Sequence, residues 1–306
     1  MSELEIGIYE RLLDTELSGA LASSPELKSI LRKIDDEAAP HTYSQFIAQL
    51  LQQALRITKT EARIPLLNQI IDLLSATDGL EYLERNRLLS DGKNLLTEVN
   101  QSTAALPRPQ TPLTTSALLT GLGNDPALEH ELRAEMATAD RVDILVSFIK
   151  WSGLRLLRPS FKKLAERGIP IRILSTSYMG ASDPVALEWL SKLPNVDVRL
   201  SYDTGGTRLH AKAYHFIRKS GYSTAYIGSA NMSHAAMTQG LEWTVKVTAQ
   251  DMPHILHRFV AEFATYWESR EFEVFEESEF VRFRKAINDY KLRSNAGPLF
   301  FADIST

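Results

Sequence analysis

Apolar residues recur every three or four positions through the first hundred residues, and this spacing predicts amphipathic helices. The stripes are clearest in two groups of side chains, Leu12, Leu13, Leu17, Leu21 and Phe46, Leu50, Leu51, Leu55. Ile64-Pro65 is expected to open another helix, because proline is tolerated in a first helical turn. The pattern predicts a helical domain over residues 1–105 whose stripes form its core, with docking of a partner as the alternative use of the same side chains.

A different pattern follows a stretch of linker composition, in which three prolines lie among Ser and Thr over residues 101–115. Short apolar runs then alternate with amphipathic segments. The run 142–149 is almost continuously apolar, which is typical of a strand buried on both faces.

Further strands are expected at residues 169–174, 196–202, 208–216, 223–227 and 241–247, and helices at 126–139, 154–167, 184–193 and 253–267. Strand–helix–strand units followed by neighbouring strands predict an α/β fold, a mixed sheet flanked by helices. We expect this domain to occupy residues 116–268 and to be followed by a C-terminal helix and linker tail over 269–306.

Composition narrows the class of protein. Hydrophobic residues make up 44% and charged residues 24%, as in soluble globular proteins, and the absence of cysteine excludes a disulfide framework and a thiol nucleophile. No apolar run is long enough to span a bilayer and no secretory signal is visible, so we expect a cytoplasmic protein without a membrane partner. The net charge is −5 over residues 1–110 and +2 over 111–268, so a polyanion would meet the second segment.

Polar side chains concentrate around three of the expected strands. His210 and Lys212 lie two positions apart in one strand, so alternation places them on one face. Ser229 and Asn231 follow the next strand, and Glu242 stands at the start of the strand after that. Because ligands bind at strand ends in open α/β sheets, we expect these five side chains to form one site.

This set of groups suits chemistry on a phosphodiester. The neutral imidazole of His210 is a competent nucleophile near pH 7 when a partner fixes its tautomer, and Glu242 is expected to be that partner. Lys212 and the Asn231 amide can neutralise and hydrogen-bond a phosphoryl oxygen in the transition state. We assign phosphate binding to Lys212, Ser229 and Asn231, and catalysis to His210, Lys212, Asn231 and Glu242.

Three further side chains are candidates for lining the same cleft. Ser147 stands near the end of the first strand of this domain, Tyr178 lies in the loop after the second, and His234 closely follows the Gly-Ser-x-Asn run. A solvated helix position is the simpler interpretation of His234, and the opposite strand parity of His215 predicts a packing or surface role. A metal held by several histidines is the weaker alternative, because none of the familiar zinc spacings is present.

The motifs resemble the phospholipase D superfamily, whose signature is His-x-Lys followed by Gly-Ser-x-Asn, here His210-Ala211-Lys212 and Gly228-Ser229-Ala230-Asn231. The aspartate that many members carry seven residues after the histidine is replaced by Ile217. The branch without it resembles metal-independent nucleases of the restriction-endonuclease type, where a later glutamate takes the position of Glu242. More narrowly, residues 115–268 are similar to the nuclease-like module found ahead of bacterial superfamily II helicases.

The resemblance implies a metal-independent nuclease that cleaves DNA without a cofactor, through a phosphohistidine intermediate. Superfamily chemistry uses two histidines, and this sequence holds one His-x-Lys, so the resemblance implies a homodimer in which His210 of each protomer meets across a two-fold axis. It also implies association with a helicase module, in cis or in trans. The sequence contains no Walker A pattern, so we expect no helicase motor in this chain itself.

Two other functions remain open on the sequence. One is a DNA-binding module with a weak or inactive site that helps to load or guide a helicase. The other is a lipid or small-diester phosphodiesterase, which the lack of a second His-x-Lys and of a membrane-binding helix disfavours.

Overall fold

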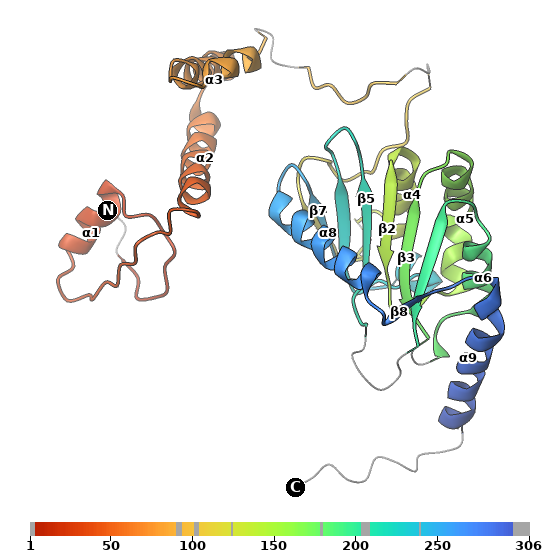
Figure 1. The fold of residues 1–306 in the computed structure, drawn as a ribbon. Helices are drawn as coiled ribbons and strands as arrows, with labels where there is room; N and C mark the ends of the chain where they lie inside the picture. Colours follow the sequence, from red (N-terminus) through yellow and green to blue (C-terminus); the bar gives the residue numbers. More distant parts are fainter. Residues whose placement is uncertain are drawn as a thin grey trace. The chain divides into compact units, whose positions relative to one another are not determined.

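The computed structural model describes most of the chain, namely residues 4–89, 94–100, 104–123, 125–177, 180–202, 209–238 and 240–295. The chain divides into two compact units, residues 1–97 and residues 98–306, and each is described by itself. Figure 1 shows the elements of both. Within the described helices, none is long and apolar enough to cross a membrane.

The N-terminal unit consists of helices, which are α1 (Thr15–Ala22), α2 (Ala39–Ile57), α3 (Thr60–Ser75) and the 3-10 helix η1 (Glu81–Asn86). Asp14 caps α1, since its Oδ1 accepts a hydrogen bond of 2.7 Å from the N–H of Leu17. The helix expected to open at Ile64-Pro65 instead begins at Thr60, so Pro65 lies within α3.

The aliphatic stripes of this unit do not form the expected core. None of residues 4–89 is buried, and on α2 the side chains of Tyr43, Ile47 and Leu50 are 53%, 59% and 46% exposed. The prediction of a buried core here was therefore wrong. Periodicity identifies the apolar face of a helix, but it carries no information about what covers that face.

The second unit is built on a mixed sheet of eight strands, in the order β1-β7-β6-β5-β2-β3-β4-β8. Their bounds are β1 (Ala117–Leu119), β2 (Arg141–Leu145), β3 (Ile171–Thr176), β4 (Val196–Ser201), β5 (Ala213–Ile217), β6 (Thr224–Gly228), β7 (Thr244–Thr248) and β8 (Phe272–Val274). The central strands β2, β3 and β4 are parallel, and every other pairing is antiparallel. The expected mixed α/β sheet is confirmed.

Helices cover both faces of this sheet (Figure 1). One face packs against α4 (Leu128–Thr138), α5 (Trp151–Glu166), α6 (Pro184–Ser191), α7 (His234–Thr238) and α9 (Phe280–Asn295), and the other against α8 (Pro253–Glu268). The larger core cluster lies on the first face, because strand residues such as Ile144 and Ile173 alternate toward it. On the second face Arg172 lies against the α8 ring of Phe263, with the guanidinium carbon 4.8 Å from the ring centroid.

The segment expected to be a helix and linker tail over 269–306 contributes to the fold in its described part. Strand β8 pairs antiparallel with β4 and closes that edge of the sheet. The side chains of Phe283 and Ile287 on α9 are buried in the larger core cluster. Burial of these two side chains ties α9 to the sheet.

A buried ionic network lies between α4 and the strands β6 and β7. The carboxylate of Glu135 is paired with Arg218 at 2.5 Å and with Lys246 at 3.1 Å, and the hydroxyl of Tyr226 donates to it at 2.9 Å. Lys246 also donates to the Thr111 hydroxyl at 2.8 Å. The linker at Thr111 is therefore fixed to the sheet through charged groups withdrawn from water.

A second carboxylate of α4 holds the same piece of linker. Glu131 is fully buried and accepts a hydrogen bond of 2.7 Å from the N–H of Gln110, together with bonds from the N–H and the hydroxyl of Thr111. Two backbone donors of the linker are thus satisfied by one side chain. We call residues Gln110 and Thr111 the linker clamp.

Candidate active site

Three neighbouring strands bring the motif residues to one edge of the sheet. Because β5, β6 and β7 are antiparallel, the start of β5, the end of β6 and the start of β7 meet at the same edge. The expected strands were too long, since β5 begins at Ala213 and β7 at Thr244. His210, Lys212 and Glu242 therefore precede their strands rather than lying within them.

Lys212 is the buried cation of this edge. Its side chain is 5% exposed, its ammonium donates to the carbonyl oxygen of His210 at 2.6 Å, and its own carbonyl accepts from the N–H of Gly228 at 3.0 Å. Burial lowers the pKa of Lys212, and the nearby carboxylate of Glu242 opposes that shift. The imidazole of His210 is exposed at the surface next to this ammonium-bearing turn.

Ser229 and Glu242 form the best-connected pair. The Ser229 hydroxyl donates to the Glu242 carboxylate and accepts from the N–H of Trp243 at 3.2 Å. The backbones lie so close that a Cβ at Gly228 would stand 2.1 Å from the carbonyl oxygen of Trp243, so this position requires glycine. Among the described contacts, none joins Glu242 to the imidazole of His210, so the orienting role expected of Glu242 stays a prediction.

Asn231 is fixed to the central part of the sheet. Its side chain is buried and its Oδ1 accepts a hydrogen bond of 3.2 Å from the N–H of Phe148, which follows β2. The Asn231 amide nitrogen remains as the donor that could meet a phosphoryl oxygen. Ser233 caps α7, because its Oγ accepts from the N–H of Ala236 at 3.4 Å.

The three candidates for lining the cleft have different outcomes. Ser147 is buried beyond the end of β2, and its Oγ has no hydrogen-bond partner within the described part of the chain. His234 is exposed on the first turn of α7, and its carbonyl and ring face Thr238 of the same helix. Tyr178 lies outside the described residues.

His215 is buried on the α8 face of the sheet, apart from the motif residues. Its ring meets the ring of Phe259 edge-on, with centroids 5.0 Å apart, and its Nδ1 lies 3.9 Å from the Asp143 carboxylate. Burial lowers the pKa of His215 to about 4, with Asp143 opposing and Arg141 and Arg172 adding to the shift. The imidazole is therefore neutral in the folded protein at neutral pH.

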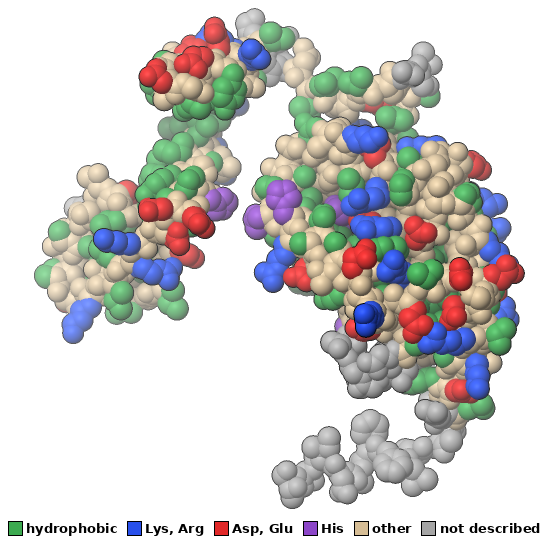
Figure 2. All heavy atoms as spheres, in the orientation of Figure 1, with side chains coloured by type: hydrophobic (Ala, Val, Ile, Leu, Met, Phe, Trp, Pro, Cys, Tyr) green, Lys and Arg blue, Asp and Glu red, His purple; other side chains and the backbone are tan. Residues whose placement is uncertain are grey.

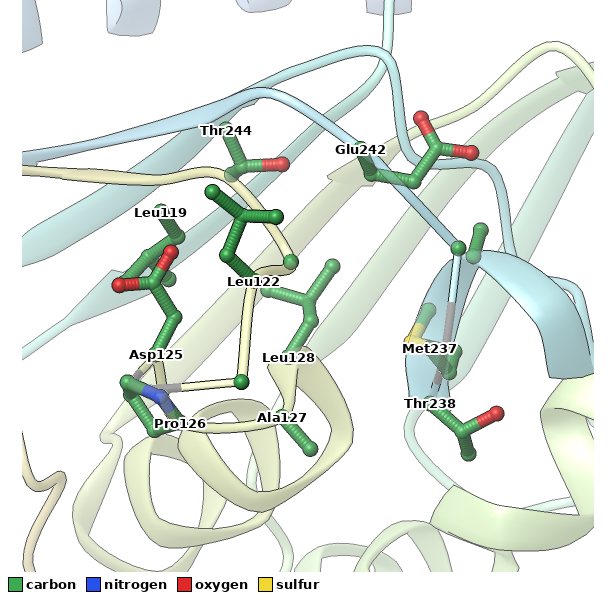
Figure 3. A pocket seen from close by; sticks show the side chains of 14 residues that line it. Leu119, Leu122, Asp125, Pro126, Ala127, Leu128, Met237, Thr238, Glu242 and Thr244 are labelled. Carbon is green, nitrogen blue, oxygen red and sulfur yellow. The ribbon is translucent and has the colours of Figure 1, made fainter.

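A pocket beside Glu242 was not foreseen from the sequence. It is lined by residues of the loop between β1 and α4, by α7, and by the start of β7 (Figure 3). Leu119, Leu122 and Leu128 stand on one wall and Met237 on the other. No motif marks these positions, because their apolar side chains look like ordinary core residues in a single sequence.

Few side chains of the site can interact with a phosphodiester. An exposed imidazole, a buried ammonium, an amide donor, a carboxylate and a hydroxyl lie at the same edge of the sheet. On the face that carries α8, acidic, basic and apolar side chains are intermingled, so this face shows no extended patch of a single charge (Figure 2). Within the described residues, no group of three or more His, Asp or Glu is placed to hold a metal ion.

Part of this chain is similar in structure to several solved proteins. Similar solved structures include NucT from Helicobacter pylori (20% identity, TM-score 0.40, covering 53% of this chain and 99% of that chain). They also include Nuc from Salmonella typhimurium, a phospholipase D family member (15% identity, TM-score 0.41, covering 53% and 100%). A third is phosphatidylserine synthase from Haemophilus influenzae (13% identity, TM-score 0.41, covering 59% and 45%). No curated protein matched the sequence.

A family model matches part of the second unit. Residues 133–267 match the model described as "Cardiolipin synthase, PLD-like domain". The matched segment contains β2 to β7 and all five motif residues of the sheet edge. Residues 133–267 are therefore similar to a phospholipase D-like domain over somewhat less than half of the chain.

Proposed function

We propose that this chain is a metal-independent nuclease that hydrolyses phosphodiester bonds of DNA. The observation that carries the proposal is the placement of Lys212, Ser229, Asn231 and Glu242 at one sheet edge beside the exposed imidazole of His210. The ammonium and the amide would stabilise the negative charge that builds on the phosphoryl oxygens in the transition state. His210 would be the nucleophile.

The reaction proceeds in two steps. A nitrogen of His210 attacks phosphorus, the phosphorus–oxygen bond to the leaving nucleotide breaks, and the leaving oxygen takes a proton from a second imidazole. Water then attacks the phosphohistidine, gives its proton to the second imidazole, and releases the phosphate monoester and His210. We assign the second imidazole to His210 of a second protomer, which makes the homodimer the active form.

Cleavage in the presence of excess EDTA tests this proposal. The purified chain is incubated with single-stranded and double-stranded DNA, and in parallel with phosphatidylglycerol vesicles. We expect DNA cleavage that survives EDTA and is absent in His210→Ala, whose exposed position should tolerate the change. Cleavage that vanishes with EDTA and returns with a divalent ion would refute the mechanism, and faster hydrolysis of the vesicles would refute the substrate.

A second function is favoured by the exposed apolar side chains of α2. Tyr43, Ile47 and Leu50 leave a face that a helicase partner could cover, and a weakly active, DNA-binding module would serve such a partner. Under this alternative the purified chain binds DNA but cleaves it only when the helicase is added. Cleavage by the chain alone at a rate unchanged by α2 substitutions would count against it.

A further inference from the structure

The positive charge of the second unit is concentrated in α5 and the two residues that flank it. Residues 150–167 contain six Lys and Arg side chains and a single acidic one, Glu166, which gives this segment a net charge of +5. Since residues 111–268 together carry +2, the rest of that range carries −3, and the whole chain carries −4. The segment is therefore a basic region in an acidic protein.

The two sides of α5 carry different chemistry. The inner side is buried in the larger core cluster, through Leu154, Leu157, Phe161 and Leu164. The outer side is basic, because Arg155, Lys162 and Lys163 are exposed there and Arg158 is half-buried. We call these four residues the basic stripe.

The charge of the basic stripe is not neutralised by the protein. None of its four side chains forms an ion pair with any residue that the structure describes. Arg158 stacks on the rings of Trp151 and Trp189, with its guanidinium carbon 5.7 and 5.3 Å from the two centroids, which holds the side chain but leaves its charge. The nearby acidic side chains have other basic partners, in the pairs Glu129–Arg133, Asp183–Lys150 and Glu188–Arg284. The stripe can therefore receive an anion from outside the chain.

The basic stripe begins next to the candidate active site. The N–H of Lys150 donates to the carbonyl oxygen of Met232 at 2.8 Å, so the start of α5 lies against the residue that follows Asn231. A Cβ at Gly153 would stand 2.5 Å from the nitrogen of Ser233. Strand β2 leads into α5 and ends beside the start of β5, because these two strands are antiparallel. The helix therefore starts at the sheet edge that carries the motif residues and runs away from it (Figure 1).

The dimensions of the stripe suit a repeating anion. With 16 residues, α5 is about 24 Å long, which matches the axial length of about seven successive phosphates along one strand of duplex DNA. Arg155 and Lys162 are seven residues, or two helical turns, apart and lie on the same side of the helix about 10 Å from each other along its axis. A single phosphate could reach only one of these two side chains, whereas a polyphosphate backbone could reach both.

We propose that the basic stripe of α5 binds the phosphate backbone of the DNA that extends beyond the scissile phosphodiester. Contacts of this kind position a nucleic acid without reading its sequence. The inference rests on the proposed nuclease function and specifies where a long substrate is held. An anionic membrane is the less suitable partner, because the apolar side of α5, which would have to enter the bilayer, is buried in the core.

The first test measures equilibrium binding, using chains that also carry His210→Ala so that the DNA stays intact. A duplex and a single strand of about 30 nucleotides are titrated over a series of salt concentrations, and the form that is bound more tightly is used for the comparison. Each lost phosphate contact reduces the slope of log affinity against log salt concentration by about 1. The double variant Arg155→Gln/Lys162→Gln should therefore reduce the slope by about 2 and weaken binding about tenfold or more near 0.1 M salt.

Two control variants separate position from charge. Lys219→Gln/Arg258→Gln also removes one Lys and one Arg, which are exposed in the hairpin after β5 and on α8, and should keep the wild-type slope. Arg155→Lys/Lys162→Arg keeps both charges of the stripe and should also keep it. Urea titrations of all variants check that the exposed substitutions leave the fold intact.

The second test connects the stripe to cleavage through the length of the substrate. Bis(p-nitrophenyl) phosphate contains one phosphodiester and cannot extend along α5. In Arg155→Gln/Lys162→Gln the ratio of kcat/KM for the long DNA to kcat/KM for this small diester should fall about tenfold or more, whereas Lys219→Gln/Arg258→Gln should keep the wild-type ratio. For a trinucleotide, which covers less than half of the helix, most of the effect should disappear.

The outcomes separate this inference from the function on which it rests. If the wild-type chain cleaves long DNA and the stripe variant keeps the salt slope and the rate ratio of the control, the inference is overturned and the nuclease proposal stands. If DNA is bound through the stripe but is not cleaved, the nuclease proposal fails and the binding surface remains. If the chain does not bind DNA, the inference fails. Binding to phosphatidylglycerol vesicles that is lost in the stripe variant, with DNA binding unchanged, would assign the stripe to an anionic membrane instead.

Discussion

The Ser229 hydroxyl donates a hydrogen bond to the Glu242 carboxylate, so the serine of the Gly-Ser-x-Asn motif positions the glutamate rather than pointing freely into the site. The same hydroxyl accepts the N–H of Trp243, which restricts its rotation. The carboxylate is thereby held near Lys212, whose pKa it raises against the effect of burial. Ser229 therefore acts on the charge of the site through its neighbour.

Neutralising Glu242 should shift the pH profile of cleavage. Lys212 must be charged to stabilise the phosphoryl oxygens, so activity is lost as the pH rises through its pKa. Glu242→Gln removes the carboxylate that raises this pKa, and the alkaline loss of activity should move to lower pH. The profile of kcat/KM between pH 6 and pH 10 checks this, with Glu268→Gln on the α8 surface as control. An unshifted alkaline limb would show that Glu242 does not act on Lys212.

Two substitutions of Asn231 should distinguish its effect on stability from its effect on the rate of cleavage. Its Oδ1 holds the N–H of Phe148, which Asp could also do, whereas Ala could not. Asn231→Asp should keep most of the stability but lose about 10²- to 10³-fold in kcat, because a carboxylate replaces the donor with a negative charge near the phosphate. Asn231→Ala should lose a similar rate and be less stable in urea as well. Equal activity of Asn231→Asp and the wild type would remove the amide from the mechanism.

The proposed homodimeric active site predicts how activity changes when active and inactive chains are mixed. When wild-type and His210→Ala chains exchange subunits fully, each mixed dimer keeps one imidazole and should be nearly inactive. Activity should then fall as the square of the wild-type fraction, which a series of mixing ratios measures directly. A linear decline, or an active monomer in gel filtration, would mean that one chain suffices.

Acid should destabilise the protein through His215. The folded state keeps this residue neutral down to about pH 4, whereas the unfolded chain protonates it below about pH 6.5. The unfolded state thus binds more protons between these values, and the free energy of unfolding falls as the pH falls from 6.5 to 4. From pH 7 to pH 4.5 the wild type should lose about 2 kcal/mol more than His215→Gln in urea titrations. Identical losses would contradict a neutral buried imidazole.

The buried network around Glu135 predicts a large effect on stability. Removing the carboxylate in Glu135→Ala leaves the charges of Arg218 and Lys246 buried without their partner, which should cost about 3–5 kcal/mol of unfolding free energy. Glu129→Ala breaks a pair with Arg133 on the same helix, nearer the surface, and should cost less than about 1 kcal/mol. Urea titration of both variants provides the comparison.

The strands and the position of the motifs could be predicted from the sequence. Continuous apolar runs indicated the buried central strands, and the order of His-x-Lys, Gly-Ser-x-Asn and Glu242 along consecutive strands placed them at strand ends. The exact strand starts could not be predicted. In the sequence, Lys212 fits the alternating pattern of β5, so the expected strand included it. In the structure β5 begins at Ala213, and the Lys212 ammonium donates to the carbonyl oxygen of His210.

Other features depend on contacts between distant residues, which the local patterns of one sequence do not reveal. The stripe through Tyr43, Ile47 and Leu50 has the same spacing as a buried one, yet those side chains are exposed. Strand β8 has three residues and lies within an acidic stretch. It is too short to show a strand pattern, so its pairing with β4 could not be predicted. The hydrogen bond between Asn231 and Phe148 joins positions 83 residues apart, which no local pattern reports.

The linker clamp has a practical consequence for anyone shortening this chain. A fragment cut to residues 133–267 would remove Gln110, Thr111 and Glu131, and with them the hydroxyl that receives Lys246. It would also discard β8 and α9, uncovering the edge of β4 and part of the core. Such a fragment should be poorly soluble when expressed, whereas one that begins before Gln110 and extends through α9 should behave as an independent protein.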